Sequence, residues 1–197
     1  KQVVYIGSYS ILTSMYTTFN IMYLGFVCSS AEVGYYWTAL KIYTIVLGFY
    51  TAFTGVMLPR MSGLVKGLEL DKFNEMIRRS FDLLLTFVLP VIIVGVLLSE
   101  HLVFVLSGSG FEGAIVPMRL IMPLLLVVGV AQIIAIQVFI PLKLDGHILR
   151  ASIIGAIIGV VGNFMVVRSF GSIGTASVLL ISETAVTLYY IYFASRN

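Results

Sequence analysis

Three ionisable side chains, Lys41, Arg119 and Glu183, stand inside long apolar stretches of the sequence, where a charge is costly. A charged side chain at mid-bilayer costs roughly 2.5–3.5 kcal/mol on insertion scales, so such residues usually face a cavity or a partner. If Lys41 and Arg119 both face inward, they form a cationic ring suited to a phosphate or pyrophosphate. In the alternative interpretation, each residue extends its charged end to the lipid head groups while its stem stays in the membrane.

Glu183 falls about ten residues into the last apolar stretch, which places it near mid-depth. One hypothesis is that it acts as a proton or cation relay, because buried carboxylates in membrane helices often have a function. The other is that its carboxyl group forms a hydrogen bond to a neighbouring helix. No second carboxylate accompanies it in the same stretch.

The first apolar stretch carries a stripe of polar residues at spacings of three and four: Tyr5, Tyr9, Thr13, Tyr16, Asn20 and Tyr23. At 100° per residue these side chains share one helix face. Facing lipid would leave their polar groups unpaired, so we expect the stripe to face protein or water. Tyr9, Tyr16, Asn20 and Tyr23 could then bind a sugar, because aromatic rings stack on pyranose rings. Hydrogen bonding between helices is the alternative.

The patterns of an enzyme are absent from the sequence. It contains no P-loop, no serine elbow and no metal-binding helix motif. The single cysteine, Cys28, excludes an intramolecular disulfide and a thiolate metal site, and His101 and His147 lie in different connections. We therefore expect no catalytic residue, no metal and no cofactor, and we expect that an ion gradient or the substrate's own gradient drives any transport.

The composition predicts an integral membrane protein. The 197 residues are 59% hydrophobic and 11% charged, whereas a soluble domain has about 25% charged residues. The basic residues lie in short connections, which argues against a nucleic-acid surface. A hydrocarbon core ~30 Å thick needs about 20 apolar residues per helix. This criterion predicts an all-α lobe of six transmembrane helices, at about 3–27, 37–58, 81–98, 116–139, 151–167 and 173–194.

The connections also predict an orientation. Lysines and arginines gather on one side of the predicted helices, which favours cytoplasmic termini, and the other side carries Arg168, Glu32, Glu100 and Glu112. Within 62–80, apolar residues recur at helical spacing opposite charged ones. This pattern suits either an amphipathic cytoplasmic helix in the lipid interface or a solvated connector. Because the chain begins at Lys1, we expect a missing N-terminal part.

Four segments, in this order, carry a family resemblance: "NIMYLGFVCSSAEVGYYWTALKIY", "LPRMS", "VLSGSGFEGAIVPMRLI" and "GNF…FGSIGTASVLLISE". Together they resemble the C-terminal half of bacterial polysaccharide flippases. These are the O-antigen and capsule repeat-unit exporters of the multidrug/oligosaccharidyl-lipid/polysaccharide exporter superfamily. The resemblance covers essentially the whole chain.

The resemblance implies two six-helix lobes, with twelve to fourteen helices in all, around a cavity that opens alternately to each side. The implied substrate is an undecaprenyl-pyrophosphate-linked oligosaccharide, moved to the outer leaflet of the inner membrane during surface polysaccharide biosynthesis. Lys41 and Arg119 would meet its pyrophosphate-sugar head, and the missing N-terminal lobe would complete the cavity. Asn20 stands where many relatives have an aspartate, so ion coupling at that position is not expected.

Three other functions compete with this interpretation. A multidrug exporter lobe would need titratable acids along its cavity, and Glu183 is the one candidate. A membrane enzyme of polysaccharide assembly, such as a polymerase or ligase, would need a large arginine-rich outer loop, whereas the outer connections here are short. The third is a purely structural scaffold of helices.

Overall fold

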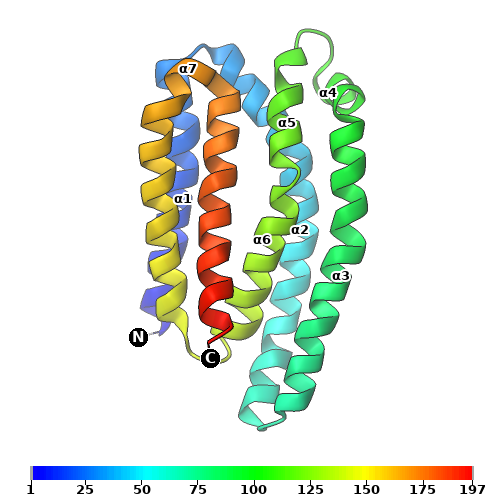
Figure 1. The fold of residues 1–197 in the computed structure, drawn as a ribbon, viewed down its shortest axis with the longest axis vertical. Coiled ribbons are helices and arrows are strands. Elements are labelled where there is room, and N and C mark those ends of the chain that lie inside the picture. The colour runs from blue at the N-terminus through cyan, green and yellow to red at the C-terminus, as the bar shows by residue number, and fades with distance from the viewer. Residues whose placement is uncertain (1, 197) are drawn as a thin grey trace.

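A computed structural model describes residues 2–196 of the protein, with the backbone alone for 2–6, 8–12 and 16. The described residues form helices and turns without any strand. Long helical rods lie side by side along one axis (Figure 1). They are α1 (Gln2–Val27), α2 (Ser30–Lys66), α3 (Leu70–Leu97), a composite rod of α5 (Ile115–Ile121), α6 (Leu124–Gln132) and η2 (Ile133–Phe139), and α7 (Asp145–Ala194). The predicted all-α architecture is confirmed.

Gly171 divides α7 into two antiparallel halves at one end of the bundle (Figure 1). Its φ of 53° and ψ of −131° interrupt an otherwise continuous helix, in a conformation that is accessible to glycine but strained for other residues. The break falls between the predicted helices 151–167 and 173–194. With α7 counted as two rods, the rods correspond to the six predicted helices.

Four helical segments of the described chain are long and apolar enough to cross a membrane: Ser30–Lys66, Leu70–Leu97, Glu112–Phe139 and Asp145–Ala194. Large apolar side chains cover their outer surfaces, such as Val56 and Met165, which are 77% and 75% exposed. An exposed apolar surface of this kind suits lipid rather than water. The membrane-protein class predicted from composition is therefore confirmed.

The segment 62–80 differs from the separate interfacial helix that was one of its two predicted forms. Instead, α2 continues to Lys66, a tight turn follows, and α3 begins at Leu70. Phe73 and Met76 are buried and pack with Met61 across this hairpin, which projects beyond the other helices (Figure 1). The apolar residues of the segment thus stabilise the hairpin itself, and a pattern with helical spacing fits that role as well as lipid contact.

The predicted helix 116–139 is divided into three pieces. Pro123 lies between α5 and α6, where its missing N–H interrupts the helical hydrogen bonds. The last seven residues, η2, form a π-helix, a conformation that is frequent at functional sites. The rod is correspondingly bent beside α2 (Figure 1).

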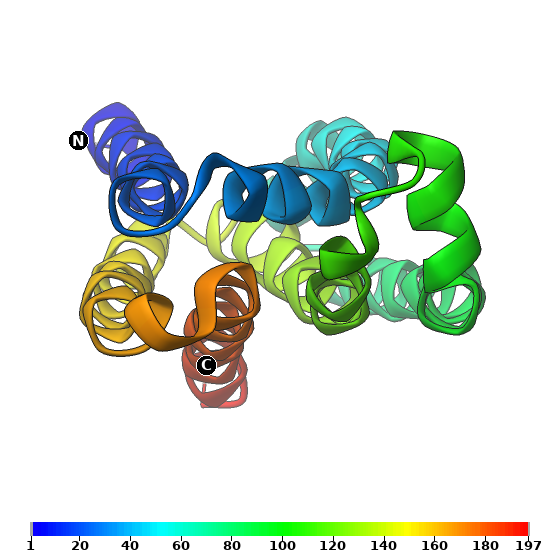
Figure 2. The same ribbon diagram turned by 90° about the horizontal axis from the view of Figure 1, so that it is seen from above.

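At the end of the bundle that carries Gly171, the short helix α4 (Ser99–Ser107) lies crosswise to the rods (Figures 1 and 2). It leads into a loop and the 3-10 turn η1 (Glu112–Ala114). In the loop, the Gly110 N–H donates a hydrogen bond to Glu112 Oε1 at 3.0 Å.

Candidate binding cavity within the membrane helices

A cavity of about 380 Å³ lies between α1, α2, the α6–η2 rod and α7. Polar side chains reach it from all sides except η2, whose residues at the cavity are apolar. Uncharged and acidic groups of this kind are costly inside a membrane unless they face water, a ligand or each other. The polar residues at the cavity are Thr13, Thr17, Tyr43, Thr51, Gln132, Ser152, Glu183 and Tyr190.

One wall of the cavity is held by a hydrogen bond between two rods. The Gln132 Nε2 of α6 donates to Thr51 Oγ1 of α2 at 2.9 Å, and Thr54 Oγ1 approaches Gln132 Oε1 at 3.5 Å. Sequence reasoning missed this pair. Gln132 is a polar residue within an apolar stretch, and this feature of the sequence could have identified it.

Glu183 lies at the cavity and is half-buried. None of the described residues that line this cavity is basic. The carboxyl group therefore shares the cavity with hydroxyl and amide groups. This location suits both hypotheses made from the sequence, a relay and a hydrogen-bonded carboxyl, and its function stays a prediction.

In the structure, Arg119 has partners within the protein and Lys41 is exposed. Arg119 Nε donates to Ser99 Oγ at 2.7 Å, and its Nη2 lies 3.5 Å from Glu100 Oε1. Lys41 is exposed on α2, and among the described side chains it takes part in no hydrogen bond or ion pair. Neither residue lines the 380 Å³ cavity. Their role in pyrophosphate binding stays a prediction.

Asn20 contacts another helix rather than the cavity. It is 1% exposed, and its Oδ1 accepts a hydrogen bond of 2.8 Å from Asn163 Nδ2 of α7. The same Nδ2 also donates to the Gly159 carbonyl at 2.6 Å. Of the predicted polar stripe, Thr13 reaches the cavity. The side chains of Tyr9 and Tyr16 lie outside the described residues.

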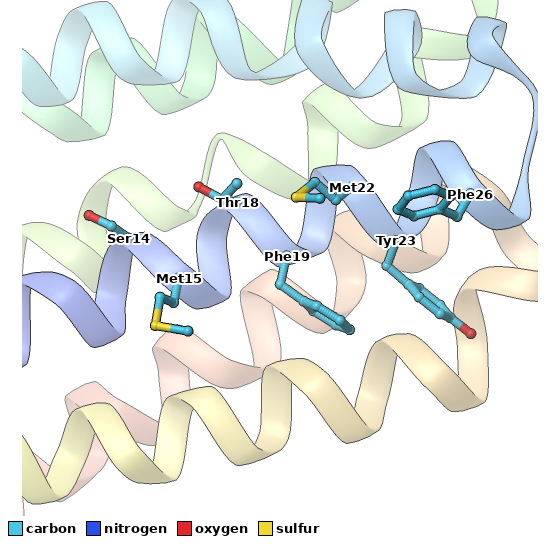
Figure 3. Close-up of a pocket in the computed structure, with 7 residues that line it drawn as sticks. All are labelled: Ser14, Met15, Thr18, Phe19, Met22, Tyr23 and Phe26. Carbon is cyan, nitrogen blue, oxygen red and sulfur yellow. The ribbon is translucent and has the colours of Figure 1, made fainter.

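Tyr23 belongs to a different surface of α1. Its ring packs against Phe19 and Phe164, with ring centres 5.6 and 4.7 Å away. It also borders a groove of about 600 Å³ along α1, shown in Figure 3. That groove is lined mainly by apolar side chains, so it suits lipid chains better than sugar hydroxyls. The lining residues are Ser14, Met15, Thr18, Phe19, Met22, Tyr23 and Phe26.

Comparison with known proteins connects this fold to polysaccharide assembly. The chain is 25% identical over 193 residues to "Putative O-antigen transporter" of Escherichia coli (strain K12), which covers 93% of this chain and 44% of that protein. It is 22% identical over 198 residues to "Probable low-salt glycan biosynthesis flippase Agl15" of Haloferax volcanii, which covers 96% and 41%. The chain thus spans less than half the length of these curated relatives. No solved structure matches the chain.

The family assignment rests on a match to one family model. Residues 3–116 match the model described as "Polysaccharide biosynthesis protein". The matched region includes α1, α2, α3 and α4, and it covers more than half of the chain. The protein is therefore a member of this polysaccharide biosynthesis protein family.

Proposed function

We propose that the chain is one lobe of a flippase that moves lipid-linked oligosaccharide repeat units across the cytoplasmic membrane during surface polysaccharide biosynthesis. The polar cavity between four membrane elements carries this proposal, because it offers hydroxyl and amide partners to a sugar. The names of the two relatives support transport of a glycan. The rest of the longer protein would supply the second lobe, and this chain alone would not transport.

In the proposed mechanism, the two lobes rock about the cavity, which opens alternately to each side of the membrane. The sugar head crosses through the cavity and bonds to Thr51 and Gln132 on one wall, while the undecaprenyl tail stays in lipid. Lys41 is exposed and would meet the pyrophosphate. Arg119 can join it after leaving Glu100, since an ion pair this exposed is worth only about 0–1 kcal/mol. Both termini are cytoplasmic in this mechanism, and no catalytic residue is needed.

Glu183 would serve as the ion relay of the same cavity. A carboxyl group among neutral polar side chains can take up or release a proton as the cavity changes sides. The same acid also favours a second candidate function, the lobe of an ion-coupled multidrug exporter. The two candidates differ in substrate, because a multidrug exporter would not need hydroxyl and amide partners for a sugar.

The test uses the full-length protein in a host whose own flippase is deleted. The double variant T51V/Q132L removes the polar wall between α2 and α6. We expect it to lower surface polysaccharide roughly tenfold or more, the equivalent of about one hydrogen bond of 1.4 kcal/mol. The matched control is T44V, because the Thr44 hydroxyl bonds to the Leu40 carbonyl within its own helix. Normal surface polysaccharide in T51V/Q132L would overturn the proposal.

Two further variants examine the charged residues. K41A should reduce surface polysaccharide while the protein still inserts normally, and unchanged polysaccharide would show that Lys41 only reaches the head groups. E183Q should remove the pH dependence of transport. Efflux of cationic drugs that is lost in E183Q, together with unaffected polysaccharide, would favour the multidrug exporter.

A further inference from the structure

Glu32, in the first turn of α2, contacts the break in α7. Its Oε2 accepts a hydrogen bond of 2.7 Å from the backbone N–H of Ser172, the first residue after Gly171. Ser172 is 1% exposed. Close by, Cys28 Sγ approaches the Val167 carbonyl at 3.5 Å, so the α1–α2 connection meets both sides of the break. Figure 2 shows these segments together at one end of the bundle.

The chemistry of helix ends explains why a carboxylate belongs at this position. The first N–H groups of a helix lack partners within the helix, and the helix dipole favours negative charge there. Ser172 begins the second half of α7, and Glu32 also lies in the first turn of α2. The Glu32 carboxylate therefore places its negative charge at the start of α2 and at the start of the second half of α7.

Gly171 makes the approach possible. A Cβ at this position would lie 2.5 Å from Glu32 Oε2, and its positive φ disfavours other residues independently. The glycine and the glutamate are thus matched to each other across two segments 139 residues apart in sequence, since Glu32 and Gly171 meet only in the folded chain.

The same contact lies at an equal number of residues from two side chains of the cavity. From Glu32 and Ser172, α2 and the second half of α7 both lead away from this end of the bundle (Figure 1), and the first turns of α2 lie across it (Figure 2). Tyr43 follows Glu32 by eleven residues, and Glu183 follows Ser172 by eleven residues. Eleven residues rise about 16.5 Å and complete about three turns, so each pair shares a helix face. Tyr43 and Glu183 both line the cavity, each eleven residues along its helix from the contact.

We propose that Glu32 is a positioning residue: its hydrogen bond to Ser172 sets the relative depth and rotation of the two cavity walls that carry Tyr43 and Glu183. The geometric part, that this hydrogen bond sets the positions of the two helices, rests only on the observed contact between Glu32 and Ser172. The effect on transport rests on the proposed function of the cavity.

The geometric part is tested by measuring the distance between spin labels at Thr44 and Ile181, which are both exposed. The labels are placed in the full-length protein after its native cysteines are replaced, and the distance is measured in lipid nanodiscs. E32A should broaden or shift the distance distribution. S172P should do the same, because proline lacks the N–H but suits the first turn of a helix. E32Q should preserve the distribution, because its amide oxygen can still accept the bond.

The matched control is E100A, which removes an exposed acid that pairs with Arg119 of α5. It should leave the distance unchanged. A native distribution in both E32A and S172P would overturn the proposed contact. If E32A does not insert in the membrane, the distance distributions of E32Q and S172P still test the contact, because E32Q should resemble the native protein and S172P should not.

Measurements of export distinguish a positioning role of Glu32 from a role in stabilising the fold alone. E32A and S172P should lower polysaccharide export roughly tenfold at normal membrane abundance, and E32Q should restore near-native export. A shifted distance with unchanged export would overturn the positioning role. Failure of the proposed function has a different signature, in which T51V/Q132L exports normally while the spin-label distances still respond to E32A.

Discussion

Leucine substitutions at Asn20 and Asn163, made singly and together, test whether these amides hold two helices together or bind substrate. Both side chains are buried in the contact of α1 with α7, and one hydrogen bond of 2.8 Å joins them. The Asn163 Nδ2 also donates to the Gly159 carbonyl. Among the described residues, the Asn20 Nδ2 and the Asn163 Oδ1 have no hydrogen-bond partner. This arrangement makes the two single substitutions unequal.

N163L removes the donor and leaves both polar atoms of Asn20 buried without a partner, which costs about 1–3 kcal/mol of stability. N20L removes one bond between helices, worth about 0.6 kcal/mol on average in a membrane protein. It also removes the amide nitrogen that already lacked a partner, so its net cost should stay below about 1 kcal/mol. The double variant has no unpaired amide left and should be more stable than N163L, with a coupling energy of about 1–2 kcal/mol.

The assay is reversible unfolding of the full-length protein in mixed micelles, with export measured in parallel. The expected order of destabilisation is N163L, then N20L and the double variant, both well below it. Strictly additive effects, or a larger cost for N20L than for N163L, would refute the assigned hydrogen bonding. A stable N20L protein that fails to export would instead show that Asn20 contacts substrate, as its place in the polar stripe suggests.

Two other perturbations have outcomes set by the contacts. G129A places a Cβ 2.4 Å from a terminal carbon of buried Leu84, so it should destabilise the protein by about 1–3 kcal/mol. In the control G48A, the added Cβ meets no atom within 4 Å, so this variant should stabilise its helix by about 0.5–1 kcal/mol. E100Q releases Arg119 from its ion pair; if Arg119 binds the pyrophosphate, substrate affinity should rise about two- to fivefold, and equal affinities in E100Q and the native protein would count against that role.

The helices could be predicted from sequence because the bilayer fixes the length of an apolar segment. The break at Gly171 falls in the short interval between two predicted helices for the same reason. The partner of each helix face could not be predicted. Thr13 and Asn20 share a face of α1, yet Thr13 reaches the cavity and Asn20 reaches α7. They lie about 10 Å apart along the helix, so one face of α1 meets a cavity at one level and a packed helix contact at another.

Pattern alone was also ambiguous where one arrangement of side chains satisfies two environments. The apolar residues of 62–80 would fit the lipid interface, but Phe73 and Met76 pack inside the α2–α3 hairpin. Arg119 was predicted to meet either a ligand or the lipid head groups, whereas the structure pairs it with Glu100, a residue that the sequence analysis used as a marker of orientation. Local patterns identify residues that need a partner, and tertiary structure decides which partner it is.

The cavity walls are tied to one another by polar contacts between helices. In lipid, no hydrophobic driving force selects one helix register over another, so hydrogen bonds and close packing must do so. Thr51 and Gln132 tie α2 to α6, the two asparagines tie α1 to α7, and Glu32 ties α2 to the second half of α7. Of these three contacts, the first borders the cavity and the second is fully buried. The half-buried Glu32 contact lies at the end of the bundle, and of the three it is the one that joins the helix of Tyr43 to the half of α7 that carries Glu183.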